Sequence, residues 1–173
     1  MRLFVAFDLG ELDSYFIDLQ KKLPKEMASF RLTESFHITL KFLGDVMPQY
    51  IENYKKMLKE IKVKPFTITF NKLGYFSKEK IHVVWAGLED NRKVMKFQSD
   101  VDNSLRKYFP KTERFHPHVT LGRVKKVYNA EGFKEKLKEI AVSSKEFRVK
   151  GFKLIMSTLT SEGPIYEDVG VFE

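Results

Sequence analysis

The sequence predicts an α+β fold in which two pseudo-symmetric lobes, each an antiparallel sheet with outer helices, form a central cleft. Two observations support this prediction. The first is a repeat, because His37-Ile38-Thr39-Leu40 and His118-Val119-Thr120-Leu121 lie 81 residues apart. The second is that strand-like and helix-like segments follow in the same order in both halves of the chain. We therefore expect one domain, residues 1–173, with lobes of roughly 1–81 and 82–173.

The same offset aligns similar residues outside the two tetrapeptides, which a chance match would not do. The further matches are Leu3–Ala6 with Val84–Gly87, Phe16 with Phe97, Phe66-x-Ile68 with Phe147-x-Val149, and Lys72-Leu73 with Lys153-Leu154.

In the first lobe, strands are predicted at residues 2–8, 37–43 and 66–70, where apolar residues alternate or run together between turn residues. Helices are predicted near residues 11–23 and 48–61, where apolar residues recur at helical spacing. Pro24 helps to end the first helix, and Pro48 suits the first turn of the second.

In the second lobe, strands are predicted at residues 83–88, 118–124 and 146–158, with a bulge possible at Gly151, and a last strand at 165–171. Apolar spacing marks one helix from Val94 to Leu105 and another from Phe133 to Ile140. The segment 77–80 is the only candidate linker, and it is too short to separate independent domains.

Composition narrows the class of protein. A hydrophobic share of 43% is ample for a packed core, and the absence of cysteine excludes disulfides, a thiolate nucleophile and a zinc ribbon. The net charge of +8 favours a polyanionic partner such as RNA, although many of the lysines will lie on solvated helix faces. Apolar runs are too short to span a membrane, and the first residues resemble a strand more than a signal peptide. We expect a cytoplasmic protein with no membrane partner.

The repeated motif suggests a single site. Alternate residues of a strand share a face, so His37 and Thr39 face one way and the apolar residues between them face the other. The same holds for His118 and Thr120. If the lobes pack about a pseudo-twofold axis, the two polar faces meet across one cleft. We therefore predict His37 and His118 as catalytic residues and Thr39 and Thr120 as substrate-binding residues.

Two histidines suit phosphodiester chemistry. One can take a proton from water while the other gives a proton to the leaving oxygen, and a pKa of about 6.5 allows both roles near neutrality. Threonine hydroxyls can donate hydrogen bonds to phosphoryl oxygens. A single His-x-Thr motif is more often structural, but two copies at equivalent positions favour catalysis. Neither a cofactor nor a metal ion is expected, because His116-Pro117-His118 lacks a neighbouring carboxylate cluster.

Other polar residues near the motifs are assigned lesser roles. His82 and His116 are expected to be surface or structural residues. Lys41 shares the face of His37 by simple alternation, yet it could be an ordinary solvated lysine. Alternation places Arg123 on the face opposite His118, so a phosphate contact from Arg123 is not expected.

Aromatic residues near the motifs could stack on a base, although core packing is the favoured role. They are Phe42, Tyr75 and Phe76.

The chain resembles the RNA 2′,3′-cyclic phosphodiesterases of the 2H phosphoesterase superfamily, whose members have also been named 2′-5′ RNA ligases. The resemblance covers almost the full length and shows no departure at the motif positions. It rests on Met1–Ala6, Phe36–Gly44, Leu73–Phe76, Val83–Leu88, Pro117–Arg123, Ser157–Leu159 and Gly163–Tyr166.

The resemblance implies hydrolysis of a terminal 2′,3′-cyclic phosphate on RNA to a 2′-phosphomonoester, with His37 as proton donor, His118 as proton acceptor, and Thr39 and Thr120 binding the phosphate. The expected partner is RNA with such an end, tRNA fragments among the candidates, and the expected state is a monomer. Two alternatives stay open: ligation, the reverse reaction, as the working activity, and a non-catalytic RNA-binding module.

Overall fold

A computed structural model describes residues 1–161 and 163–173. The strands are β1 Arg2–Asp8, β2 Ala28–Leu32, β3 His37–Asp45, β4 Phe66–Ser77, β5 Ile81–Leu88, β6 Val119–Val127, β7 Lys145–Val149, β8 Phe152–Leu159 and β9 Pro164–Phe172. The α-helices are α1 Asp13–Lys21, α2 Ile51–Lys59, α3 Arg92–Leu105 and α4 Ala130–Glu139, and short 3-10 turns at Gly10–Leu12 and Pro48–Tyr50 precede α1 and α2. The α+β class with antiparallel strands is confirmed.

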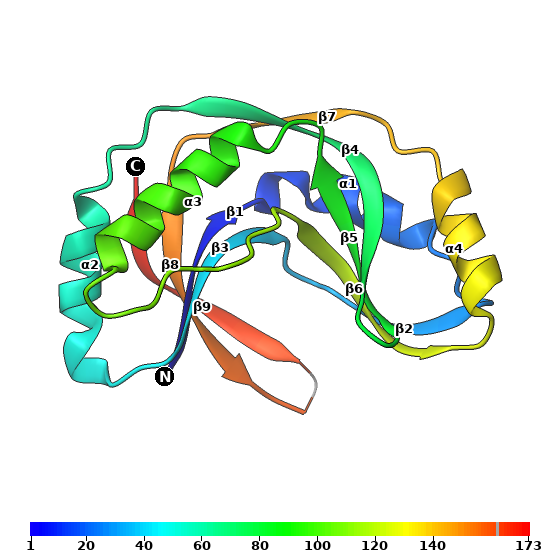
Figure 1. The fold of residues 1–173 in the computed structure, drawn as a ribbon, viewed down its shortest axis with the longest axis horizontal. Helices are drawn as coiled ribbons and strands as arrows, with labels where there is room; N and C mark the ends of the chain where they lie inside the picture. Colours follow the sequence, from blue (N-terminus) through cyan, green and yellow to red (C-terminus); the bar gives the residue numbers. More distant parts are fainter. Residues whose placement is uncertain (162) are drawn as a thin grey trace.

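The strands form two half-sheets that curve away from each other (Figure 1). Along the sheet the order is β7-β4-β5-β6-β3-β1-β8-β9, and β2 pairs with β6 beside β3. We call β3, β1, β8 and β9 the His37 half-sheet, and β7, β4, β5, β6 and β2 the His118 half-sheet.

A single residue pair joins the two half-sheets. Within the described chain, β3 and β6 pair only at Ile38 and Val119. Beyond that point β2 takes the place of β3 along the same edge of β6, from Leu32 opposite Gly122 to Ala28 opposite Val127. The sheet therefore turns sharply between the residues that follow His37 and His118.

The two halves of the chain exchange elements. Strand β4 lies in the first half of the sequence but pairs with β5 and β7, and β8 lies in the second half but pairs with β1. Likewise, α1 packs against β6 and α3 packs against β3. Because each half of the chain contributes to both half-sheets, neither half-sheet can form from one half of the sequence alone. The segment 77–80 proves to be no linker, because Ser77 ends β4 and residues 78–80 form the turn between the paired strands β4 and β5.

The repeat preserves which face a residue occupies, but not every strand register. In the His37 half-sheet Phe4 pairs with Phe42, whereas in the His118 half-sheet Val83, not Trp85, pairs with Arg123. Strand β5 is thus displaced by two residues relative to the 81-residue offset. A shift of two residues keeps every side chain on its original face, so the repeat remains visible in the sequence.

Burial on both sides of the sheet gives the molecule a main core and a small second cluster. In β1 the residues Leu3, Val5 and Phe7 enter the main core under the helices. Phe4 and Ala6 point to the opposite face, where they pack with Ile155 and Tyr166. This second cluster forms an apolar floor on the face of the sheet that lacks covering helices.

Some elements differ from the sequence predictions. Strand β2 was not predicted, although Ala28, Phe30 and Leu32 alternate with Ser29 and Arg31; the strand is only five residues long and pairs with β6. The predicted strand at 146–158 is two strands, β7 and β8, which break at Lys150-Gly151 and join different half-sheets. No helix among the described residues is long and apolar enough to cross a membrane.

Candidate active site

His37 is the first residue of β3 and lies on the apolar floor. Its half-buried ring packs against Phe4 at a centroid distance of 5.0 Å and edge-on against Tyr166 at 5.3 Å. Asp8 is its cross-strand partner on β1. The strand start fixes the backbone of His37, and the two aromatic rings limit the orientation of its imidazole.

His118 lies just before β6 and is held by a backbone contact. Its Nδ1 is 2.7 Å from the carbonyl oxygen of His116, and its ring meets Phe76 edge-on at 4.7 Å. A carbonyl oxygen can only accept, so Nδ1 must carry the hydrogen and donate it. In neutral His118 the free lone pair is therefore on Nε2, which makes that atom the available proton acceptor.

The two imidazoles influence each other electrostatically. Burial lowers the pKa of His37 to about 4; the Asp8 carboxylate opposes this shift and a charge on His118 adds to it. Burial also lowers the pKa of His118, while the bond to the His116 carbonyl raises it and the charges of His116 and Arg123 lower it further. The predicted histidines are thus brought near one another from two half-sheets, and both favour the neutral form at pH 7 in the ligand-free protein.

The predicted threonines are half-buried, two positions after each histidine. Thr39 lies opposite Ala6 and Thr120 lies opposite Trp85. Neither hydroxyl forms a hydrogen bond with another of the described residues, so both are available to a ligand.

Lys41 does not share the face of His37, and the prediction from alternation was wrong. Val5 pairs with Lys41 and Ala6 pairs with Thr39, which leaves Leu40 without a partner in a β-bulge. After the bulge, the Lys41 side chain points into the helix side of the sheet, where only 3% of it is exposed.

A matching bulge in β6 brings Arg123 to the site, contrary to the sequence prediction. Val84 pairs with Gly122 and Trp85 with Thr120, so Leu121 is skipped as Leu40 is. Arg123 is exposed, and after the skipped residue it lies on the same face as Thr120. Burial lowers the pKa of His118 and raises the pKa of Tyr166, and the positive charge of Arg123 acts to lower both pKa values. Phe42, at the position equivalent to Arg123, lies over Phe4 and is 73% exposed.

The remaining residues missed by sequence reasoning are aromatic. The rings of Trp85 and His116 pack edge-on, with their centroids 4.8 Å apart, beside Phe76. Tyr166 comes from β9, near the end of the chain. One sequence signal could have revealed the bulge in β3. Leu40 and Leu43 both face the core although they are three residues apart, a spacing that strict alternation does not allow.

Known sequences match this chain over most or all of its length. Two segments of the chain, residues 9–85 and 87–166, match the family described as LigT like Phosphoesterase. The chain is 34% identical to a protein of Archaeoglobus fulgidus named RNA 2′,3′-cyclic phosphodiesterase, with 100% of both sequences covered. A protein of the same name from Methanocaldococcus jannaschii is 32% identical, with 96% of this chain and 97% of the relative covered.

Solved structures show the same fold. The structure of TT0787 from Thermus thermophilus superimposes with a TM-score of 0.80 at 23% identity, covering 99% of this chain and 97% of that one. LigT of Escherichia coli, solved with 3′-AMP, superimposes with a TM-score of 0.76 at 23% identity, covering 98% of this chain and 95% of that one.

Proposed function

The chain belongs to the LigT-like phosphoesterase family, and on that premise we propose that it hydrolyses the terminal 2′,3′-cyclic phosphate of RNA to a 2′-phosphomonoester. The observation that carries the proposal is that two half-buried histidines, one from each half-sheet, directly precede Ile38 and Val119, the residues that pair between the half-sheets. Such a pair can hold one proton acceptor and one proton donor on either side of a phosphorus atom.

The proposed reaction is an in-line displacement by water. His118 Nε2 takes a proton from the water as its oxygen bonds to phosphorus. The bond between phosphorus and the 3′ oxygen breaks, and His37 gives a proton to that oxygen, leaving the phosphate on the 2′ oxygen. The hydrogen bond that fixes the His118 tautomer supports its role as acceptor.

His37 needs its substrate to become a donor. With a pKa of about 4, it is mostly neutral in the ligand-free protein at pH 7. An anionic phosphodiester bound beside it favours the protonated form and so raises its pKa. The donor is thereby charged mainly when a phosphate is in place.

Three side chains are proposed to bind the phosphoryl oxygens. Thr39 and Thr120 would each donate a hydroxyl hydrogen, and Arg123 would supply a charged donor able to make two hydrogen bonds. Arg123 is added to the set predicted from sequence because the β6 bulge puts it on the same face as Thr120.

The reaction is proposed to need no metal ion, because the two imidazoles account for both proton transfers. Among the described residues, no group of three or more histidine, aspartate or glutamate side chains is arranged to hold a metal ion. Exhaustive chelation should therefore leave the rate unchanged.

The cellular setting is also a proposal. We propose a cytoplasmic monomer that acts on RNA ends such as those of cleaved tRNA, where a cyclic phosphate would arise. The edge strands support the monomer: β7 carries Lys145, Glu146 and Arg148, and β9 begins at Pro164 and carries Glu167 and Asp168. Charged residues and proline on edge strands disfavour pairing with another sheet. Light scattering at working concentration tests this state.

End-group analysis tests the proposed function. An oligoribonucleotide ending in a 2′,3′-cyclic phosphate is incubated with the protein and with His118→Gln as the control. The expected product is a 2′-phosphate end in the wild-type sample only. A 3′-phosphate end, a joined product when a 5′-hydroxyl strand is added in excess, or bound but unaltered RNA would each contradict hydrolysis as proposed.

A further inference from the structure

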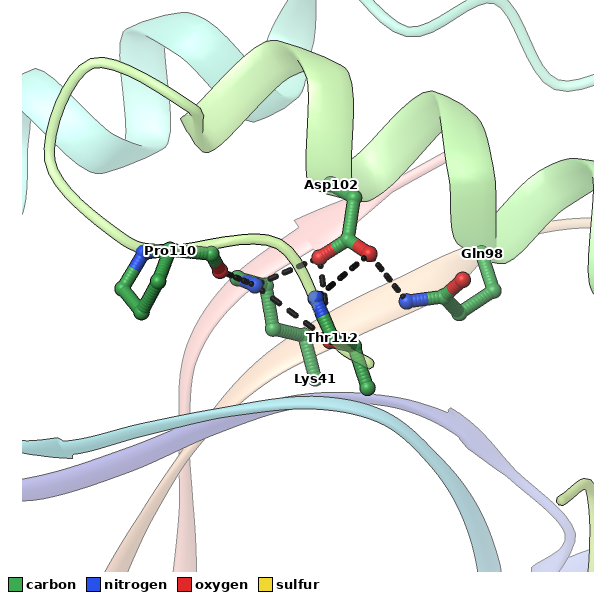
Figure 2. Close-up of polar contacts among 5 residues, drawn as sticks. All are labelled: Lys41, Gln98, Asp102, Pro110 and Thr112. Atoms are coloured by element: carbon green, nitrogen blue, oxygen red, sulfur yellow. Dashed lines mark hydrogen bonds and ion pairs between the residues drawn. The ribbon is translucent and has the colours of Figure 1, made fainter. Parts of the chain in front are cut away.

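A buried ion pair lies behind the sheet from the candidate site. Lys41 Nζ lies 2.5 Å from Asp102 Oδ1, and each side chain is only 3% exposed. Lys41 comes from β3, four residues after His37, and Asp102 comes from α3 (Figure 2).

The pair is enclosed in a set of hydrogen bonds. Lys41 also donates to the Pro110 carbonyl at 2.7 Å. Asp102 accepts from Gln98 Nε2 at 2.8 Å, from the Thr112 backbone N–H at 3.1 Å and from the Thr112 hydroxyl at 3.1 Å. Burial alone would raise the pKa of Asp102, but its bonds from Lys41, Gln98 and Thr112 lower it below the usual value. Asp102 is therefore a charged carboxylate.

Three of these contacts hold a loop rather than the helix. Pro110 and Thr112 belong to residues 106–118, which connect α3 to β6 and end at His118 (Figures 1 and 2). Lys41 thus ties the loop that carries one predicted catalytic histidine to the strand that carries the other. In Figure 2 the loop passes directly over the β3 side chain of Lys41.

The tie limits where His118 can lie. Five residues lie between Thr112 and His118, and two prolines, Pro110 and the buried Pro117, restrict the backbone around this stretch. Backbone pairing between β3 and β6 is restricted to Ile38 and Val119 among the described residues. The loop is therefore a second connection between the strands of the two histidines.

A buried ion pair is a poor way to gain stability. Removing two charges from water costs more than their attraction commonly returns, and apolar replacements are often neutral or stabilising. Leucine and methionine would fill this space beneath α3, but they could not bond the Pro110 carbonyl and the Thr112 N–H. The bonds to the loop distinguish this ion pair from ordinary core packing.

We propose that Lys41 and Asp102 are positioning residues that hold loop 106–118 against β3 and thereby set the placement of His118 relative to His37. The proposal rests on the proposed function of the two histidines. It predicts that the ion pair contributes to the turnover rate although neither residue touches the substrate. A displacement of about 1 Å at a catalytic group can lower the rate by about 10²-fold.

The test compares three variants with a matched control. Lys41→Met breaks the pair, and Lys41→Met/Asp102→Leu replaces it by apolar side chains. Thr112→Val keeps the pair but removes the Thr112 hydroxyl, which donates to Asp102 and accepts from Lys41. Leu137→Ala, in α4 on the far side of the His118 half-sheet, is the control for general destabilisation. Each is measured for urea unfolding, for kcat and KM on a cyclic nucleotide, and for the NMR titration of the ring protons of His37 and His118 without substrate.

Positioning predicts a separation of stability from activity. In the double variant, the urea midpoint should return towards the wild-type value, while kcat stays about 10²-fold low with KM changed less than about threefold. The His118 ring signal should shift in this variant and in Thr112→Val, but not in Leu137→Ala. If Lys41→Met does not fold, the double variant and Thr112→Val still provide the comparison.

A purely structural ion pair gives the opposite result. Recovery of both stability and kcat in the double variant, with unshifted ring signals, would overturn the proposal. The ring signals need no substrate, so inactivity of the wild-type protein on cyclic phosphates would count against the proposed function alone. The positioning of His118 would then still be decided by NMR.

Discussion

Ile38 and Val119 are equivalent residues of the repeat, and they pair with each other in antiparallel register. Two equivalent residues can pair in this way only if the local twofold axis passes between them. His37 and His118 each lie one residue before this pair, so they stand on opposite sides of the axis. The candidate site therefore exists only where the two half-sheets meet.

The pH dependence of kcat/KM, which reports the free protein, should differ from that of kcat, which reports the substrate complex. One neutral and one protonated histidine are needed, so kcat/KM should follow a bell with limbs set by the ligand-free pKa values. These are about 4 for His37 and a value below 6.5 for His118, which places the optimum of kcat/KM in the acid range. The kcat profile should lie at higher pH, because the bound anion raises both values. A kcat/KM optimum above pH 7 would contradict this reading of the site.

Stability should also respond to pH through His37. Its pKa is about 4 when folded and about 6.5 when unfolded, so the unfolded chain binds the extra proton between these values. Stability from this residue is complete above about pH 6.5 and falls as the pH drops towards 4. When the pH falls from 7.5 to 4.5, the free energy of unfolding of His37→Gln should therefore rise relative to that of the wild type, by about 1 to 3 kcal/mol. Urea unfolding at both pH values measures this, with exposed His82→Gln as control; equal changes in both variants would refute the buried-histidine explanation.

Much of the fold could be predicted from sequence because the apolar pattern records which face each residue occupies. Helices α1 to α4 and the strands of the two motifs were found from spacing alone. Strand β2 was missed although Ala28, Phe30 and Leu32 alternate with polar residues, because this pattern covers only five residues and the strand is held by pairing with β6. The division between β7 and β8 was missed for a related reason, as their partners lie in different half-sheets.

The candidate site was predicted only as far as the bulges. His37, Thr39, His118 and Thr120 precede the bulges, and simple alternation gives them a common face. Beyond Leu40 and Leu121, each strand has one extra residue, and so the assignments of Lys41 and Arg123 were reversed. Tyr166 enters from β9, and no local pattern connects it with His37.

The threonine hydroxyls should matter to the rate but little to stability. Thr39→Val and Thr120→Val keep the side-chain shape and remove one donor each. If each donor faces the phosphoryl group, kcat should fall by about 10²-fold, as for other oxyanion donors. Thr158→Val, on an exposed part of β8, is the matched control and should leave kcat unchanged. Wild-type rates in the Thr39 and Thr120 variants would show that these hydroxyls do not contact the transition state.

Arg123 should contribute binding that depends on its shape as well as its charge. Arg123→Ala should weaken the binding of a 2′-phosphorylated product and lower kcat/KM by about 10- to 100-fold, the equivalent of about 1.5 to 3 kcal/mol for a charged hydrogen bond. Arg123→Lys should recover only part, because lysine cannot make the two parallel bonds. Lys125→Ala, two residues further along β6, is the control. Equal losses at positions 123 and 125 would point to general charge attraction instead of a phosphate contact.

The roles of the two histidines can be separated with an activated substrate. A phosphodiester with a good leaving group, such as a nitrophenolate, has little need of a proton donor but still needs its water activated. If His37 is the donor, His37→Gln should lose several orders of magnitude on the RNA substrate and recover much of this on the activated one, whereas His118→Gln should stay slow on both. The tautomer fixed by the His116 carbonyl gives the reason, since it leaves Nε2 of His118 as the accepting atom. Rescue of His118→Gln alone would exchange the two roles while leaving the site in place, and full activity of either single variant would exclude a mechanism that needs both histidines.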